Sequence, residues 1–259
     1  MIDGAYAVAG ALTGFVVGLT GVGGGALMTP LLLLVFGVPP TTAVATDLWF
    51  AAITKLVGAR VHQTNGNVDW QVARRLWSGS LPAALLVVVL VSLGLRVGKI
   101  EWLSVAIGVL VLVAGVGLLV GPKLAALASD GFGGLRQSRE SMRRSVGAAA
   151  GAVLGVCVAL TSVGAGALGS VMLMYLYPSR MTPHRLVATD IVHAIPLAMI
   201  AGVGYLLAGL VDWWMLASLL LGSVPAVIAG SLLAGKFSGR FIQISLALVL
   251  IAAGVKVLS

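Results

Sequence analysis

Long apolar segments separated by short polar loops constrain the fold of this 259-residue chain more than any other feature. Most of these segments hold about 20 residues, the length that an α-helix needs to cross a bilayer. The composition agrees, because 59% of the residues are hydrophobic and only 9% are charged. We therefore expect an all-α polytopic membrane protein. The segments run over residues 4–20, 26–37, 41–61, 71–94, 101–120, 146–160, 167–178, 185–208, 213–235 and 240–258.

Two glycine-rich stretches interrupt the apolar pattern at corresponding places. The first reads GLTGVGGGAL over residues 18–27, and the second reads ALTSVGAGAL over residues 159–168, 141 positions later. Glycine costs about 1 kcal/mol relative to alanine in a helix interior, so the backbone should open at both stretches. Paired helix breaks in two halves of a membrane protein are a sequence indicator of a transporter's substrate site.

The similarity between the two halves extends beyond the glycine stretches. Ala-Thr-Asp at 45–47 recurs at 188–190, Val-Asp-Trp at 68–70 recurs at 211–213, and Gly-Ser-Leu-Pro at 79–82 corresponds to Gly-Ser-Val-Pro at 222–225. We therefore expect a first membrane repeat over residues 1–120, a polar linker over 121–145 and a second repeat over 146–259. Small residues at 10, 14 and 18 recur at 151, 155 and 159, which predicts close helix packing.

Basic residues predict how the repeats are oriented. The linker should be cytoplasmic by the positive-inside rule, because it carries the cluster Arg136, Arg139, Arg143 and Arg144. Inverted repeats then leave only Arg96, Lys99 and Lys256 outside, with Lys55 within a span. Parallel repeats would also place Arg180, Arg185, Lys236 and Arg240 outside. We therefore expect inverted repeats, each with three transmembrane helices and a glycine-broken hairpin whose short second arm suggests a re-entrant segment.

The glycine stretches also indicate a chemistry. Helices that begin after Gly25 and Gly166 direct unpaired backbone amides and the positive end of the helix dipole into the loops, an arrangement that binds anions. The alternative is that these glycines only permit close helix crossing. On the first interpretation, the substrate-binding residues are Thr20, Gly21, Gly23, Gly24, Gly25, Thr161, Ser162, Gly164, Gly166 and Lys55.

Ionisable residues within the spans are functional candidates by default, because they are costly in a bilayer. Asp47 and Asp190 are equivalent in the two repeats, and either can carry a coupling proton or serve as a helix-entry residue that binds nearby backbone. Lys55 has the predicted depth of Asp190, and its second-half equivalent is Ala198. We expect Lys55 to pair with Asp190 in the empty protein and to release it to protonation when an anion binds, or else to snorkel to the interface. His193 has no partner at metal-ligand spacing and should be a packed histidine.

Several function classes find no support in the sequence. The net charge of +8 arises from basic residues between apolar segments, without a patch suited to nucleic acid. No nucleophile–base pair, metal cluster or large soluble domain is apparent, so the chain is not expected to be an enzyme or to bind a cofactor. Its single cysteine, Cys157, excludes an internal disulfide. The expected partners are a small anion, the lipid bilayer and a coupling proton.

The duplicated GLTGVGGGALMTP, ATD, VDW and GSLP segments together resemble the sulfite exporter TauE/SafE family of membrane permeases over essentially the whole chain. The resemblance implies a multi-pass protein of the bacterial inner membrane, an exporter and secondary transporter for sulfite, sulfoacetate or a related organosulfonate. Many members carry serine at the positions of Asp47 and Asp190, which suggests a different coupling mechanism or substrate here. An uncoupled anion channel or facilitator, and a membrane scaffold or enzyme subunit, remain as alternatives.

Overall fold

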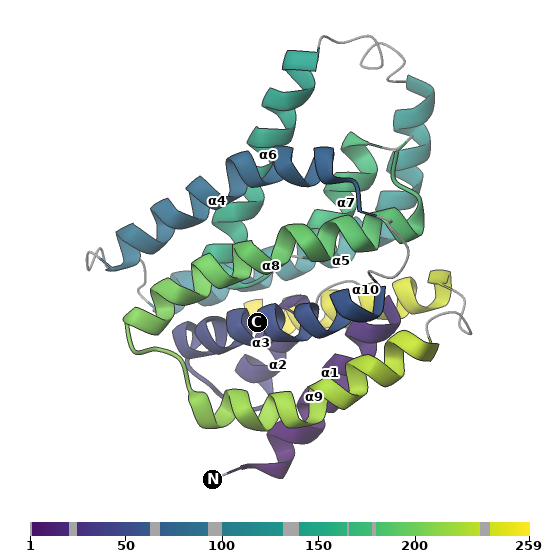
Figure 1. Ribbon diagram of the computed structural model, residues 1–259. Coiled ribbons are helices and arrows are strands. Elements are labelled where there is room, and N and C mark those ends of the chain that lie inside the picture. Colours follow the sequence, from purple (N-terminus) through teal and green to yellow (C-terminus); the bar gives the residue numbers. More distant parts are fainter. Residues whose placement is uncertain are drawn as a thin grey trace.

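A computed structural model describes residues 2–20, 25–62, 68–92, 100–131, 140–164, 166–177, 180–233 and 239–259. These residues form ten α-helices and no β-strand, which confirms the predicted all-α fold (Figure 1). The helices are α1 (Gly4–Thr20), α2 (Gly25–Leu34), α3 (Pro40–His62), α4 (Trp70–Ser92), α5 (Ile100–Gly131), α6 (Glu140–Thr161), α7 (Ala167–Leu176), α8 (Pro183–Leu207), α9 (Trp213–Leu233) and α10 (Gly239–Leu258).

The helices differ in their ability to cross a bilayer. Within the described ranges, four have the length and hydropathy of a span, and they are α4, α5, α8 and α9. Helix α3 has 23 residues, but Asp47, Lys55 and Arg60 lower its hydropathy. Helices α2 and α7 have 10 residues each, or about 15 Å at the rise of an α-helix, which is half of a hydrocarbon core.

The glycine stretches lie where helices end. Helix α1 ends at Thr20, and α2 begins at Gly25. Helix α6 ends at Thr161, Ser162, Val163, Gly164 and Gly166 are not helical, and α7 begins at Ala167. The predicted break is therefore present at the second stretch. Residues 21–24 of the first stretch lie outside the described residues.

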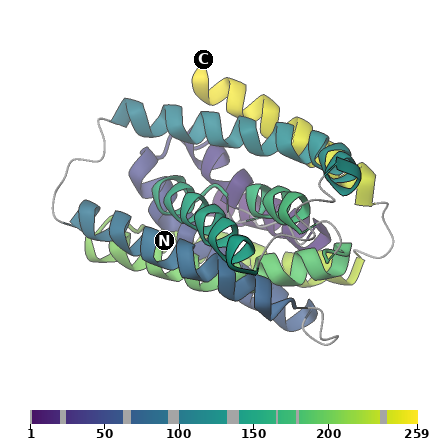
Figure 2. The ribbon, with the colours of Figure 1, turned by 90° about the horizontal axis from the view of Figure 1, so that it is seen from above.

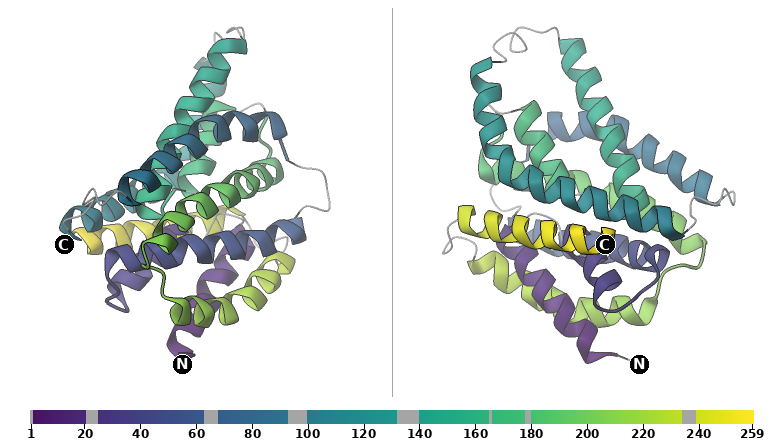
Figure 3. Two further views of the ribbon diagram at one scale, coloured as in Figure 1. Left: turned by 60° about the vertical axis from the view of Figure 1, so that its left-hand side comes forward. Right: turned by 180° about the vertical axis from the view of Figure 1, so that it is seen from behind.

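The two halves interlock through glycines. Helix α1 packs on α9, and its counterpart α6 packs on α4. Each of the two pairs crosses at a steep angle (Figures 1 and 3). A β-carbon added at Gly10 would lie 2.0 Å from the carbonyl oxygen of Leu219, and one added at Gly151 would lie 2.2 Å from that of Leu76. Positions 151 and 76 are the repeat equivalents of positions 10 and 219. The two contacts are therefore equivalent: in one, a glycine of the first half meets a helix of the second half, and in the other the halves are exchanged. The predicted packing role of these small residues is confirmed.

Helices α3 and α8 meet at the centre of the molecule and run antiparallel. Near one end of the pair, Trp49 Nε1 donates a hydrogen bond to the carbonyl of Gly202 (3.1 Å). Nearer the other end, Lys55 contacts Asp190. Helices α5 and α10 also lie side by side, at the edge of the bundle seen from above (Figure 2).

Matching hydrogen bonds join the two VDW turns to the opposite half. The amide of Asp69 donates to Thr189 Oγ1 (3.0 Å), and the amide of Asp212 donates to Thr46 Oγ1 (3.2 Å). Each aspartate also caps the helix that follows, because its Oδ1 accepts the amide of Val72 or Met215. In both contacts, the threonine of an ATD segment accepts the backbone amide of the aspartate of the other half's VDW segment. This pairing explains why the two segments occur together in both repeats.

The linker region is largely helical where the structure describes it. Helix α5 continues beyond the expected apolar segment to Gly131, and α6 begins at Glu140. Residues 132–139 lie outside the described residues.

We expect the alanine variants Gly10→Ala and Gly151→Ala to lower stability by roughly 1–3 kcal/mol each, because the added methyl group meets backbone that cannot move aside cheaply. Gly4→Ala is the matched control, since nothing lies within 4 Å of the added carbon. Thermal unfolding in detergent measures the effect. Equal melting temperatures for Gly10→Ala and Gly4→Ala would contradict the close approach of α1 and α9.

Candidate functional site

A buried ion pair lies at the crossing of α3 and α8. Lys55 Nζ is 3.1 Å from Asp190 Oδ2, and both side chains are 1% exposed. The contact expected from the matching depths of these residues is therefore present. Removing one partner of such a pair costs about 3–5 kcal/mol, because the other is left as an uncompensated buried charge. Lys55 therefore requires a negative partner wherever it stays buried.

The carboxylate of Asp190 also contacts the start of α7. A β-carbon added at Gly169, in the first turn of α7, would lie 2.4 Å from Asp190 Oδ1. The positive end of a helix dipole favours negative charge at this place. Oδ1 itself has no hydrogen-bond partner among the described residues. Asp190 thus connects Lys55 to the helix that follows the second glycine stretch.

Asp47 has a different environment from its repeat equivalent. It is fully buried on α3, where the hydroxyl of Thr29 on α2 donates a hydrogen bond to Oδ2 (2.5 Å). The Ser162 hydroxyl also lies near this carboxylate. No ion pair to Asp47 is present within the described part of the chain. The two aspartates therefore differ in their partners: Asp190 contacts the ammonium of Lys55, whereas Asp47 accepts a hydrogen bond from the hydroxyl of Thr29.

The second glycine stretch adopts a backbone that glycine favours. Gly164 has φ 128° and Gly166 has φ 144°, and the carbonyl of Gly164 accepts the amides of Gly166 (2.8 Å) and Gly169 (2.9 Å). Ser162 has φ 58°, which is uncommon outside glycine. This turn brings the buried Ser162 side chain next to Asp47 and ends with the first turn of α7 next to Asp190.

Two predicted hydroxyl ligands are bonded to backbone. Thr161 Oγ1 donates to the carbonyl of Cys157 (2.7 Å) and accepts the amide of Val163 (3.2 Å). Thr20 Oγ1 donates to the carbonyl of Val16 (2.8 Å). Of the first stretch, Gly25 begins α2, whereas Gly21, Gly23 and Gly24 lie outside the described residues.

His193 is a buried neighbour of the ion pair, one helical turn after Asp190. Its Nε2 lies 3.0 Å from Ser80 Oγ, and its carbonyl accepts the indole N–H of Trp77 (3.2 Å). No three metal-ligating side chains cluster anywhere in the described ranges. His193 is therefore a packed histidine with a hydroxyl partner, as the sequence predicts.

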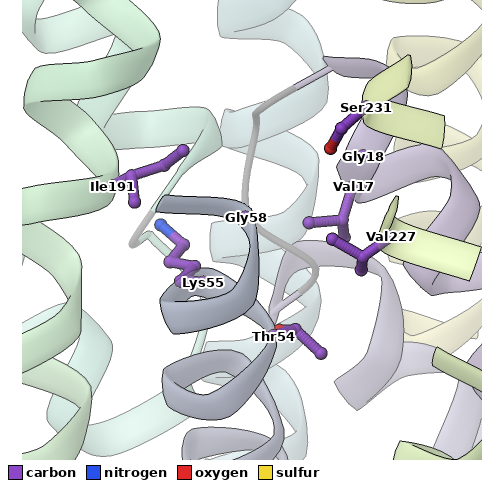
Figure 4. Close-up of a pocket in the computed structure, with 8 residues that line it drawn as sticks. All are labelled: Val17, Gly18, Thr54, Lys55, Gly58, Ile191, Val227 and Ser231. Atoms are coloured by element: carbon purple, nitrogen blue, oxygen red, sulfur yellow. The ribbon is translucent and has the colours of Figure 1, made fainter. Parts of the chain in front are cut away.

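A small cavity lies next to Lys55, between helices of both halves (Figure 4). It lies between α1, α3, α8 and α9, and its volume of about 10 Å³ has room for about one water molecule. Its polar lining consists of Lys55, Thr54 and Ser231. Sequence reasoning missed Ser231, because an isolated serine in an apolar helix carries no distinguishing signal.

The sulfite exporter TauE/SafE family matches residues 6–257 of the chain. The chain belongs to this family of membrane transporters. It is 35% identical over 256 residues to the probable membrane transporter protein YjnA of Bacillus subtilis (strain 168), a match that covers 96% of this chain and 97% of the relative. It is 27% identical over 234 residues to a probable membrane transporter protein of Xylella fastidiosa (strain 9a5c), covering 88% of this chain and 84% of the relative. No solved structure matches it.

Membership in a transporter family bears on the buried ion pair of this TauE/SafE protein. Relatives named as transporters are in keeping with a protein that moves a solute and is not an enzyme. In a transporter, an ionisable residue buried among membrane helices is a candidate for the solute path, and Lys55 is such a residue.

We expect Gly166→Val to abolish substrate binding in a protein that remains inserted, because a branched side chain both crowds the amides of α7 and resists a φ of 144°. Gly209→Val is the matched control, since Gly209 also has a positive φ (70°) but lies in the turn after α8 with nothing within 4 Å. Calorimetric titration with sulfite measures binding. Unchanged affinity in folded Gly166→Val would favour a purely structural role for the glycine stretches.

Proposed function

We propose that this TauE/SafE protein is a secondary transporter of the bacterial inner membrane that exports a small sulfur-containing anion, such as sulfite, sulfoacetate or a related organosulfonate. The observation that carries the proposal is the buried Lys55–Asp190 pair, which joins α3 to α8 beside the second glycine stretch. A lysine in this setting can exchange its carboxylate for an anionic substrate. The family description supports sulfite as the first anion to test.

The proposed architecture is a pair of inverted repeats, over residues 1–120 and 146–259, joined by a cytoplasmic linker over 121–145. Two observations support it. The equivalent helices α3 and α8 run antiparallel, and the contacts of Asp69 with Thr189 and of Asp212 with Thr46 are exchanged between the halves. Such repeats commonly rock against each other about a central site, which gives alternating access.

Charge balance at the ion pair suggests the coupling. In the empty protein, Lys55 and Asp190 neutralise each other. When an anion takes Lys55, the carboxylate of Asp190 is left buried without a cation and favours taking up a proton, because an isolated buried charge is costly. Anion and proton are then bound together and cross together, in the direction set by the sum of their two gradients.

Asp47, the repeat equivalent of Asp190, has a different role in this scheme. No cation partner appears among the described residues, so we propose that Asp47 retains a proton throughout the cycle, next to Ser162 of the second glycine stretch. Its hydrogen bond from Thr29 ties α2 to α3.

Two alternatives make different demands. An uncoupled channel or facilitator would pass the anion without any response to a proton gradient. A membrane scaffold or enzyme subunit would not bind the anion. Sulfite flux in proteoliposomes, measured with and without an imposed pH difference, separates these possibilities: coupled transport gives accumulation against the sulfite gradient, a channel gives equilibration only, and a scaffold gives neither.

We expect Lys55→Met to slow transport at least a hundredfold and Asp190→Asn to remove its dependence on the proton gradient. The double variant should lose little more than either single variant, because both changes break one interaction. Lys256→Met is the control, as Lys256 is an exposed lysine near the end of α10. Normal transport by Lys55→Met, or strictly additive losses in the double variant, would overturn the exchange.

Membrane topology is tested separately. In a Cys157→Ser background, single cysteines at positions 66, 130 and 182 should all label from the cytoplasm, and both termini should lie outside. The ion pair between Asp69 and Arg180 (3.1 Å), which brings the residue before α4 and the segment before α8 to one end of the molecule, supports this expectation. Labelling of 66 and 182 from opposite sides would contradict the inverted arrangement.

A further inference from the structure

We infer that the cavity between α1, α3, α8 and α9 is the anion site in a contracted form, and that Ser231 binds the anion together with Lys55. The inference rests on the proposed function and adds the place, the second ligand and the number of sites. The ligand class is a small oxyanion, with one oxygen for the ammonium and another for a hydroxyl.

Ser231 is the first observation that favours a ligand here. Its hydroxyl oxygen is buried and has no hydrogen-bond partner among the described residues, although burying an unpaired hydroxyl is unfavourable. It lines the same cavity as Lys55, and Figure 4 shows the two side chains on opposite walls. An acceptor between these walls would satisfy the hydroxyl and give Lys55 a negative partner in place of Asp190.

The missing symmetry of the cavity is the second observation. The repeat equivalents of Thr54, Lys55 and Ser231 are Leu197, Ala198 and Val88, and all three of these are buried and apolar. At the place related by the repeat, between α6, α8, α3 and α4, the same packing is therefore made without these polar groups. Since packing does not require them, the polar residues of the cavity serve another purpose, and each chain has one such site.

Glycines provide the space. Gly18 and Gly58 both line the cavity. A β-carbon at Gly18 would lie 2.3 Å from the carbonyl of Val227, so the backbones of α1 and α9 are in contact beside the cavity and only glycine fits there. One at Gly58 would find its nearest neighbour 3.8 Å away, at Val227 Cγ1, which is ordinary contact. Position 58 therefore accepts a methyl group without strain, and that methyl group would occupy a wall of the site.

The test compares binding to purified full-length variants by calorimetric titration with sulfite and with sulfoacetate. Ser231→Ala should weaken affinity roughly ten- to hundredfold, the effect of one hydrogen bond to a charged group. Gly58→Ala should weaken sulfoacetate more than the smaller sulfite. The control is Ser223→Ala, which removes another buried hydroxyl without a partner from α9, at a place that does not line the cavity. It should leave affinity unchanged.

Melting temperatures establish that each variant is folded. If wild-type protein binds either anion and both Ser231→Ala and Gly58→Ala bind it as tightly as Ser223→Ala does, the site lies elsewhere and the inference is overturned while the proposed function stands. If wild-type protein binds neither anion, the proposed function fails and the inference fails with it.

Discussion

A charged lysine that is buried needs a negative partner, and this requirement governs the centre of the molecule. Lys55 and Asp190 come from equivalent helices of the two halves, and each is almost completely enclosed. Their attraction offsets the cost of removing both from water only while the contact is intact. A movement that separates α3 from α8 at this level would leave both charges without a partner, and the proposed exchange supplies an anion to the lysine and a proton to the carboxylate.

The surrounding scaffold is nearly symmetric, whereas the site is not. Glycines of α1 and α6 allow backbone contact with α9 and α4, and the threonine–aspartate contacts tie the ends of the halves together. Within this frame, the second half offers Ala198 where the first offers Lys55. In the proposed transport cycle, the symmetric frame would take up two opposite conformations, and the asymmetric site would bind one anion in each.

The ends of the molecule depart from symmetry as well. Besides the hydrogen bond of its amide to Thr189, Asp69 forms an ion pair with Arg180. Arg180 also donates a hydrogen bond to Gln71 Oε1 (2.9 Å). For Asp212, no corresponding ion pair is present among the described residues. In the described conformation, the end of the molecule at Asp69 therefore has an ion pair that the end at Asp212 lacks among the described residues.

Residue patterns predicted much of this arrangement. The hydropathy pattern predicted the helices, and the repeated small residues predicted close helix packing. The matching depths of Lys55 and Asp190 along two antiparallel spans predicted the contact between them. Contacts that depend on side-chain direction could not be predicted. Thr29 reaches Asp47 across the turn between α2 and α3, Thr161 bonds to its own backbone, and Ser231 meets the cavity only because α9 crosses α1 at Gly18. Spacing along the chain does not reveal such crossings.

The exchange of partners at Lys55 is the central claim, and proton uptake on anion binding tests it most directly. Titration of purified protein with sulfite, repeated in buffers of different ionisation enthalpy at one pH, gives the number of protons bound with each anion, after correction for the protonation of sulfite itself. The account predicts about one proton per anion for the wild-type protein and none for Asp190→Asn. Anion binding to the wild-type protein without any proton uptake would contradict it.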